Sequence, residues 1–236
     1  HMIPNSRTGN RSGGFEAVDH MAWDALTNPY DGKAMGIFAE ATADKYGFTR
    51  AEQDAFSVAS VERAQAAIAS GAFKEEIVPV TVAGRKGEVT HATDEEAGKS
   101  DVAKSRTLKP AFRKENGTVT AASSSSISDG AAATVVMSAD EAFKRGIQPL
   151  ARIIAHATLA QEPEWFTTAP VGAIQSVLAK AGWSVESVDL FEINEAFAVG
   201  AMAPIRDLGI PHAKVNVNGG ACALGHPIGA SGARLV

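Results

Sequence analysis

The sequence of 236 residues contains a single cysteine, Cys222, so no disulfide can form within it. Because no secretory signal is visible either, we predict a protein of the reducing cytoplasm. No apolar run is long enough to span a membrane, and no membrane partner is expected. Basic residues are not in excess: 22 Lys and Arg stand against 27 Asp and Glu, for a net charge of −5. This balance argues against a nucleic-acid partner.

What is present is the composition of an ordinary globular protein, with 45% hydrophobic and 21% charged residues. His1 and Met2 are typical of a cloning remnant and do not enter the reasoning. No grouping of His, Cys, Asp and Glu in the sequence indicates a metal site.

A glycine-rich stretch near the C-terminus, residues 215–233, carries the clearest functional signal. It begins like a short strand and ends like the start of a helix. The loop between them consists of small residues and holds one ionisable side chain, His226. Glycines let backbone N–H groups approach a ligand, and a helix N-terminus favours negative charge there. A histidine on such a loop can donate a hydrogen bond or transfer a proton near neutral pH.

A second stretch, residues 189–197, has the same strand-to-helix form and carries Asn194 and Glu195 where the strand ends. The order strand 188–193, helix 196–208, strand 215–218 predicts neighbouring parallel strands with a helical crossover. Ligands gather at the carboxyl ends of the strands in such sheets. We therefore expect Asn194 and His226 to share one site.

The remaining pattern predicts several helices and strands. Thr49 and Glu52 form a capping box, which begins a helix that Gly71 ends. Further helices are expected over 35–45, after Ser138, and from Pro170 to Gly182, and strands over 77–82, 131–137 and 150–158.

Three stretches show little periodicity. Residues 3–33 have the composition of a loop, and residues 85–114 that of a charged, solvated excursion. Residues 123–126 are four consecutive serines, which as low-complexity sequence would form a flexible linker.

The motifs at 194–197 (NEAF), 218–220 (NGG) and 225–232 (GHPIGASG) resemble the thiolase family, the acetyl-CoA acyltransferases. The resemblance runs from about Gly32 to Val236. It implies an α/β fold: a layered α-β-α arrangement with a mixed, largely parallel sheet and an inserted loop domain. It also implies a loop domain with its entry loop over 1–126, the last strand and helix of the N-terminal domain over 127–148, and an incomplete C-terminal domain over 149–236.

The resemblance implies carbon–carbon bond formation or cleavage between acyl-CoA molecules through an acyl group on a cysteine. Coenzyme A would be substrate or product, with no further cofactor, and the protein would be a homodimer or homotetramer in fatty acid metabolism. His226 would donate to a thioester oxygen and help to activate the nucleophilic cysteine, and Asn194 would hold a water that supplies a further donor. Substrate-binding positions carried over from the family are Ser125, which contacts pantetheine, and Ala196, Phe197, Met35 and Phe112.

Simpler interpretations stand beside these roles. His226 could be a surface-loop histidine, and Asn194 a helix N-cap. Glu195 is a general base by residue type, but we expect it to orient its neighbours at the helix start. Cys222 aligns with neither family cysteine, so we predict a small buried residue and not a nucleophile.

Some positions depart from the short-chain thiolase pattern, among them Ala34, Ser123 and Phe166, which leaves the acyl-chain preference open. Both cysteine-bearing motifs of the family are missing, and both ends look cut. One hypothesis is therefore that these residues are part of a longer, active enzyme and are inactive on their own. The alternative is a non-catalytic protein that binds CoA thioesters or acts as a scaffold. A dinucleotide-binding domain is disfavoured because the glycine spacing is not G-x-G-x-x-G.

Overall fold

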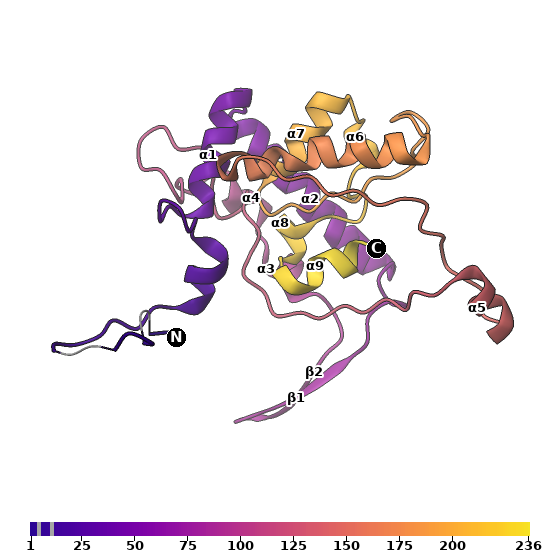
Figure 1. Ribbon diagram of the computed structural model, residues 1–236, viewed down its shortest axis with the longest axis horizontal. Helices are drawn as coiled ribbons and strands as arrows, with labels where there is room; N and C mark the ends of the chain where they lie inside the picture. Colours follow the sequence, from indigo (N-terminus) through magenta and orange to yellow (C-terminus); the bar gives the residue numbers. More distant parts are fainter. Residues whose placement is uncertain (4–5, 10–11) are drawn as a thin grey trace.

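The computed structural model describes residues 1–3, 6–9 and 12–236, so part of the loop predicted over 3–33 lies outside the described residues. A helical body forms the centre, and three exposed parts leave it: the N-terminal segment, a β-hairpin and a long excursion that carries α5 (Figure 1). The described elements are, in chain order, η1 (Ala22–Leu26), α1 (Met35–Tyr46), α2 (Arg50–Ser70), β1 (Val80–Gly84), β2 (Gly87–His91), α3 (Glu95–Lys99), α4 (Val102–Ser105), α5 (Ala139–Arg145), η2 (Pro163–Thr168), α6 (Ala169–Ala181), α7 (Ala198–Leu208), η3 (His212–Lys214), α8 (Ala221–Leu224) and α9 (Ile228–Leu235).

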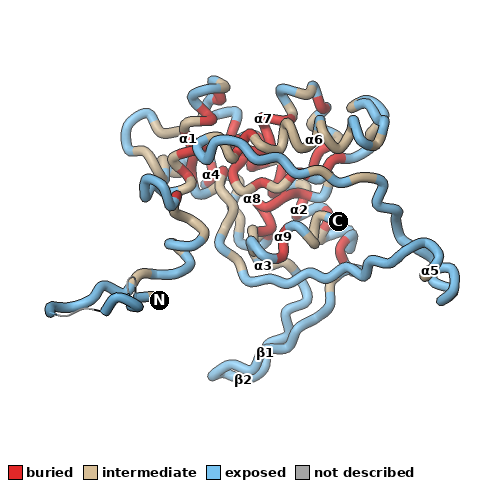
Figure 2. Tube along the Cα trace, in the orientation of Figure 1, coloured by how far each residue is buried: buried red, intermediate tan, exposed pale blue. Residues whose placement is uncertain are grey.

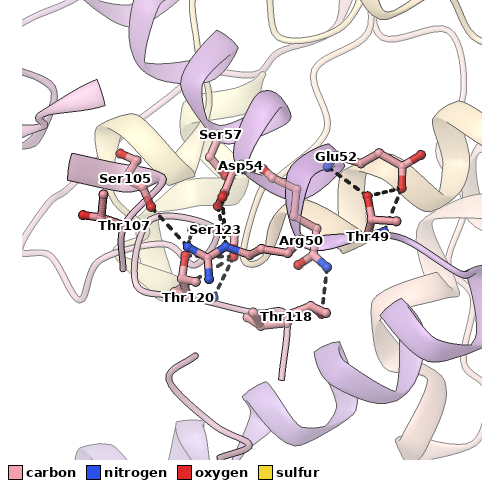
Figure 3. Close-up of polar contacts among 12 residues, drawn as sticks. Thr49, Arg50, Glu52, Asp54, Ser57, Ser105, Thr107, Thr118, Thr120 and Ser123 are labelled. Carbon is pink, nitrogen blue, oxygen red and sulfur yellow. Dashed lines mark hydrogen bonds and ion pairs between the residues drawn. The ribbon is translucent and has the colours of Figure 1, made fainter. Parts of the chain in front are cut away.

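Helix α2 begins where the sequence predicts. The Thr49 hydroxyl accepts from the Glu52 N–H at 3.2 Å, and Glu52 Oε2 accepts from the Thr49 N–H at 2.7 Å, which completes the capping box (Figure 3). Arg50, the first residue of α2, forms an ion pair with Asp54, with Nε 2.8 Å from Oδ1, and donates to the Ser105 carbonyl. These contacts fix the N-terminal end of α2 and tie it to the end of α4.

The core lies where α1 and α7 meet α2 and η2. Buried residues concentrate in this body, whereas the hairpin and the excursion around α5 are largely exposed (Figure 2). One buried carboxylate belongs to the packing: Glu40, 1% exposed, accepts from the backbone N–H groups of Thr118 and Val119. A chain segment 78 residues away is thereby fastened to α1. The predicted helix over 35–45 is confirmed.

The two stretches singled out in the sequence run in parallel, as predicted. Phe191 pairs with Val215 in a parallel bridge, in which the Phe191 N–H donates to the Lys214 carbonyl at 2.8 Å and the Asn216 N–H donates to the Phe191 carbonyl at 2.9 Å. The pairing is a single bridge and not a full strand. Helix α7 starts at Ala198, two residues later than expected, because the preceding Phe197 is held extended in an antiparallel bridge with Ser124.

The strands predicted over 131–137 and 150–158 do not form. Both segments run extended to and from α5 without a neighbouring strand (Figure 1). Their apolar side chains are exposed, Val135 at 87% and Ile153 at 62%. An apolar run becomes a strand only when another backbone accepts its hydrogen bonds, and the described residues place none beside these two segments.

The hairpin β1–β2 is the sheet found in the described part of the chain, with Val82 opposite Val89. The predicted strand over 77–82 thus starts at Val80 and runs to Gly84. Both strands are fully exposed, which agrees with a solvated excursion over 85–114, although Ala97 of α3 is buried against α8 and α2. The helix predictions after Ser138 and from Pro170 are confirmed by α5 and α6, each ended by a glycine with positive φ.

Candidate active site

Asn194 and His226 meet, as the sequence analysis predicts. Asn194 Nδ2 lies 3.3 Å from His226 Nε2, although the residues are 32 positions apart. The parallel bridge between Phe191 and Val215 makes this possible, because it brings the ends of the two strand-like segments to the same edge. Neither side chain is fully buried, so the pair lies within reach of a ligand.

Two further contacts hold His226 in place. Its N–H donates to the Ser126 carbonyl at 3.1 Å, and its Nδ1 lies 2.6 Å from Ser231 Oγ on α9. The preceding Gly225 has φ +87°, and a Cβ there would lie 2.1 Å from Ser128 Oγ, so only glycine fits. Burial lowers the pKa of His226 below its usual value, which favours a neutral imidazole at pH 7.

The run of serines is a structural clamp and not a flexible linker. The backbone N–H and the hydroxyl of Ser125 both donate to the Ala196 carbonyl, at 3.0 and 3.1 Å. The Ala198 N–H donates to the Ser123 carbonyl, and Ser123 is fully buried. With the bond from His226 to Ser126, one segment therefore holds both site loops.

Glu195 is buried, 1% exposed, directly behind the pair. Its carboxylate accepts from Ser60 Oγ at 2.7 Å, from Asn216 Nδ2 at 2.7 Å and from the Cys222 N–H at 3.1 Å. Burial raises the pKa of Glu195, and these hydrogen bonds oppose that shift. These partners enclose the carboxylate, so a substrate does not reach it. The carboxylate links α2 to the loop before His226, which agrees with an orienting role.

Cys222 does not have the environment of a nucleophile. Its Sγ lies 3.7 Å from the Glu195 carbonyl oxygen, and burial raises the pKa of its thiol well above the usual value. A nucleophilic cysteine needs the opposite shift, toward the thiolate. These contacts fit the predicted packing role, although Cys222 is partly and not fully buried.

A cavity of about 520 Å³ opens at the pair. Of the predicted site residues, Asn194, His226, Ala196 and Phe197 line it. The other three are not among its lining residues: Ser125 donates to the Ala196 carbonyl, Phe112 packs edge-to-face against Phe197 at 5.9 Å, and Met35 is partly buried against the core. Lining residues that sequence reasoning did not assign to the site include Leu159 and Glu192, while Phe166 had been noted only as a departure in the acyl pocket.

The wall of this cavity is mainly apolar, and its polar side chains include His226, Asn194, Glu192 and Thr167. Such a shape suits an acyl chain with one polar group at its reacting end. Within the described residues there is no group of three or more His, Cys, Asp and Glu side chains able to hold a metal ion.

Comparison with known proteins agrees with this arrangement. Sequence models of the thiolase N-terminal domain and the thiolase C-terminal domain match residues 1–140 and 147–236. The chain belongs to the thiolase family. An acetyl-CoA acetyltransferase of Chromobacterium violaceum is 50% identical over the whole chain, and acetyl-CoA acetyltransferase 2 of Arabidopsis thaliana is 49% identical over 99% of it.

The fold of this thiolase chain is also found in a solved structure. The crystal structure of the Bacillus anthracis acetyl-CoA acetyltransferase matches 99% of the chain with a TM-score of 0.91 and 40% identity. The predicted thiolase-like α/β fold is thereby confirmed. The mixed, largely parallel sheet expected with it is not found in the described residues, whose one sheet is the antiparallel hairpin β1–β2. The chain spans about 60% of the length of the relatives named here. None of the described helices is both long enough and apolar enough to cross a lipid bilayer.

Proposed function

We propose that this chain carries the polar half of a thiolase active site and that the whole protein transfers acyl groups between CoA thioesters. The observation that supports this most directly is the His226–Asn194 pair, whose side chains are 3.3 Å apart in the wall of a mainly apolar cavity. The relatives are named as acetyl-CoA acetyltransferases, which supports acetyl-CoA and CoA as the substrates. No cofactor beyond coenzyme A is required for this chemistry.

The pair matches the charge that such a reaction develops. Both Claisen condensation and thiolysis place negative charge on a thioester oxygen, and a positioned donor can contribute roughly 3 to 4 kcal/mol to its stabilisation. Asn194 supplies amide N–H groups there, directly or through a water. His226 supplies a side chain that takes up and returns a proton. The acyl chain would lie along Phe166 and Leu159.

The nucleophile is the part that these 236 residues do not supply, since Cys222 is their only cysteine and its thiol is held by Glu195. The proposal therefore requires a thiol from further sequence or from another molecule. It also includes a homodimer or homotetramer, a cytoplasmic location and a place in fatty acid metabolism, and these follow from the family resemblance.

The test is intact mass spectrometry beside an assay of 3-ketoacyl-CoA thiolysis with free CoA. We expect a protein heavier than 24.5 kDa that is active. The variant His226→Ala should then lose about 10²- to 10³-fold in kcat. The matched control is His20→Ala, since His20 is exposed and contacts only Asp24 among the hydrogen bonds described.

Two results would count against the proposal. An active protein in which His226→Ala equals His20→Ala would remove His226 from the chemistry. A mass of 24.5 kDa without activity would leave the non-catalytic hypothesis, and binding of CoA thioesters would then be measured by calorimetry.

A further inference from the structure

The contacts of the His226 ring form a continuous chain of hydrogen bonds. At one end Asn194 Nδ2 lies 3.3 Å from His226 Nε2. On the other side of the ring His226 Nδ1 lies 2.6 Å from Ser231 Oγ, and the Ser231 hydroxyl lies 3.2 Å from the Pro227 carbonyl oxygen. Ser231 is buried, 7% exposed, on the first turn of α9.

Each group in this chain has a limited set of roles. An amide –NH₂ only donates, so His226 Nε2 must accept from Asn194. A neutral imidazole carries one proton, which then resides on Nδ1 and is donated to Ser231 Oγ. The hydroxyl proton is left for the Pro227 carbonyl, which can only accept. One direction of donation thus satisfies all three bonds.

We propose that Ser231 is a positioning residue that holds His226 in the Nδ1–H form, so that Nε2, which lies beside Asn194 in the cavity wall, stays unprotonated. The inference rests on the proposed function for its purpose, because an unprotonated Nε2 makes the resting histidine a proton acceptor toward a bound group that displaces the Asn194 N–H. Once Nε2 has taken a proton, the same atom becomes the donor to a thioester oxygen. Ser231 therefore sets the order of the two roles.

The surroundings agree with a neutral ring in the resting state. Burial lowers the pKa of His226, and no charged partner opposes that shift. The other ionisable side chain among the described residues that line the cavity is Glu192, whose pKa is raised above its usual value, chiefly by desolvation.

The experiment is ¹⁵N NMR of histidine side chains in the chain at a pH above the pKa of His226, with His226→Gln to assign the signals. We expect a pyridine-type shift for Nε2 and a pyrrole-type shift for Nδ1. In Ser231→Ala the acceptor of Nδ1–H is gone, and the tautomer ratio should move about fivefold to tenfold toward Nε2–H. In Asn194→Asp a carboxylate faces Nε2 and can only accept, so the signals should exchange types.

The matched control is Ser126→Ala, which removes a neighbouring hydroxyl but keeps the Ser126 carbonyl that accepts from the His226 backbone N–H. Its tautomer should equal that of the wild type. In Ser231→Thr the hydroxyl remains, and the wild-type pattern should return. A pyrrole-type Nε2 in the wild type would overturn the proposal, as would an unchanged ratio in folded Ser231→Ala. The NMR signals are measured without turnover. The tautomer test can therefore succeed or fail independently of the proposed thiolase activity.

Discussion

The hydroxyl of Ser60 is one of the contacts through which α2 supports the site, and its removal should be costly. Ser60 Oγ donates to Glu195 Oε2 at 2.7 Å and accepts from the Gly220 N–H at 2.9 Å, and Ser60 is 2% exposed. The variant Ser60→Ala loses the bond to Glu195, worth about 0.5 to 1.5 kcal/mol, and leaves the buried Gly220 N–H without its acceptor, which costs about 1 to 3 kcal/mol. We expect a total loss of about 1.5 to 4.5 kcal/mol in the free energy of unfolding.

The close packing around Ser60 leaves little room for a water that could replace its hydroxyl. A Cβ on Gly220 would lie 2.2 Å from the Glu195 carboxyl carbon, so the backbone and the carboxylate are already in close contact. Water therefore cannot easily replace the hydroxyl, and the loop that leads to His226 should lose its anchor.

The assay is urea unfolding followed by circular dichroism, with Ser70→Ala as the matched control. Ser70 belongs to the same helix, but it is exposed and its hydroxyl bonds only to the Ala67 carbonyl among the contacts described. The control should stay within about 0.5 kcal/mol of the wild type. Equal midpoints for the two variants would refute the role assigned to Ser60.

Two further predictions concern stability. Replacing the cap in Thr49→Ala should cost about 1 kcal/mol, because the Glu52 N–H loses its acceptor; a urea midpoint equal to that of the wild type would show that the box contributes nothing. Burial raises the pKa of Glu195 above its usual 4.5, so the folded state binds this proton more tightly than the unfolded state. The resulting stability is fully present below pH 4.5 and is lost as the pH rises toward the folded-state pKa. Relative to Glu195→Gln, the wild type should therefore lose unfolding free energy as the pH rises above 4.5 in paired urea titrations, and a gain would contradict the shift.

Local signals in the sequence were sufficient for the longer helices, but not for the short helices α3, α4 and α8. Thr49 and Glu52 fix the start of α2 through contacts three residues apart, so the capping box could be predicted without knowledge of the rest of the chain. The prediction of strands over 131–137 and 150–158 was wrong, because a strand also needs a neighbouring strand, which the local sequence pattern does not identify. The same apolar residues that predicted strands are exposed in the structure.

The site was predictable to a similar degree. The pairing of Asn194 with His226 followed from two strand-to-helix units in succession and the edge at which parallel strands end. Phe112 and Ser125 came only from the family resemblance, and neither is among the residues that line the cavity. The burial of Glu195 depends on Ser60, 135 residues away, and no periodicity links the two.

The four serines at 123–126 show the limit of an interpretation from composition alone. A run of serines reads as a linker because small polar residues cannot build a core. Here the backbone supplies the order instead: its carbonyls and N–H groups pair with Ala196, Ala198 and His226, and the small side chains allow that close approach. The run thus crosses both site loops and fixes their separation. A low-complexity segment can be a rigid part of a site when its backbone, and not its side chains, makes the contacts.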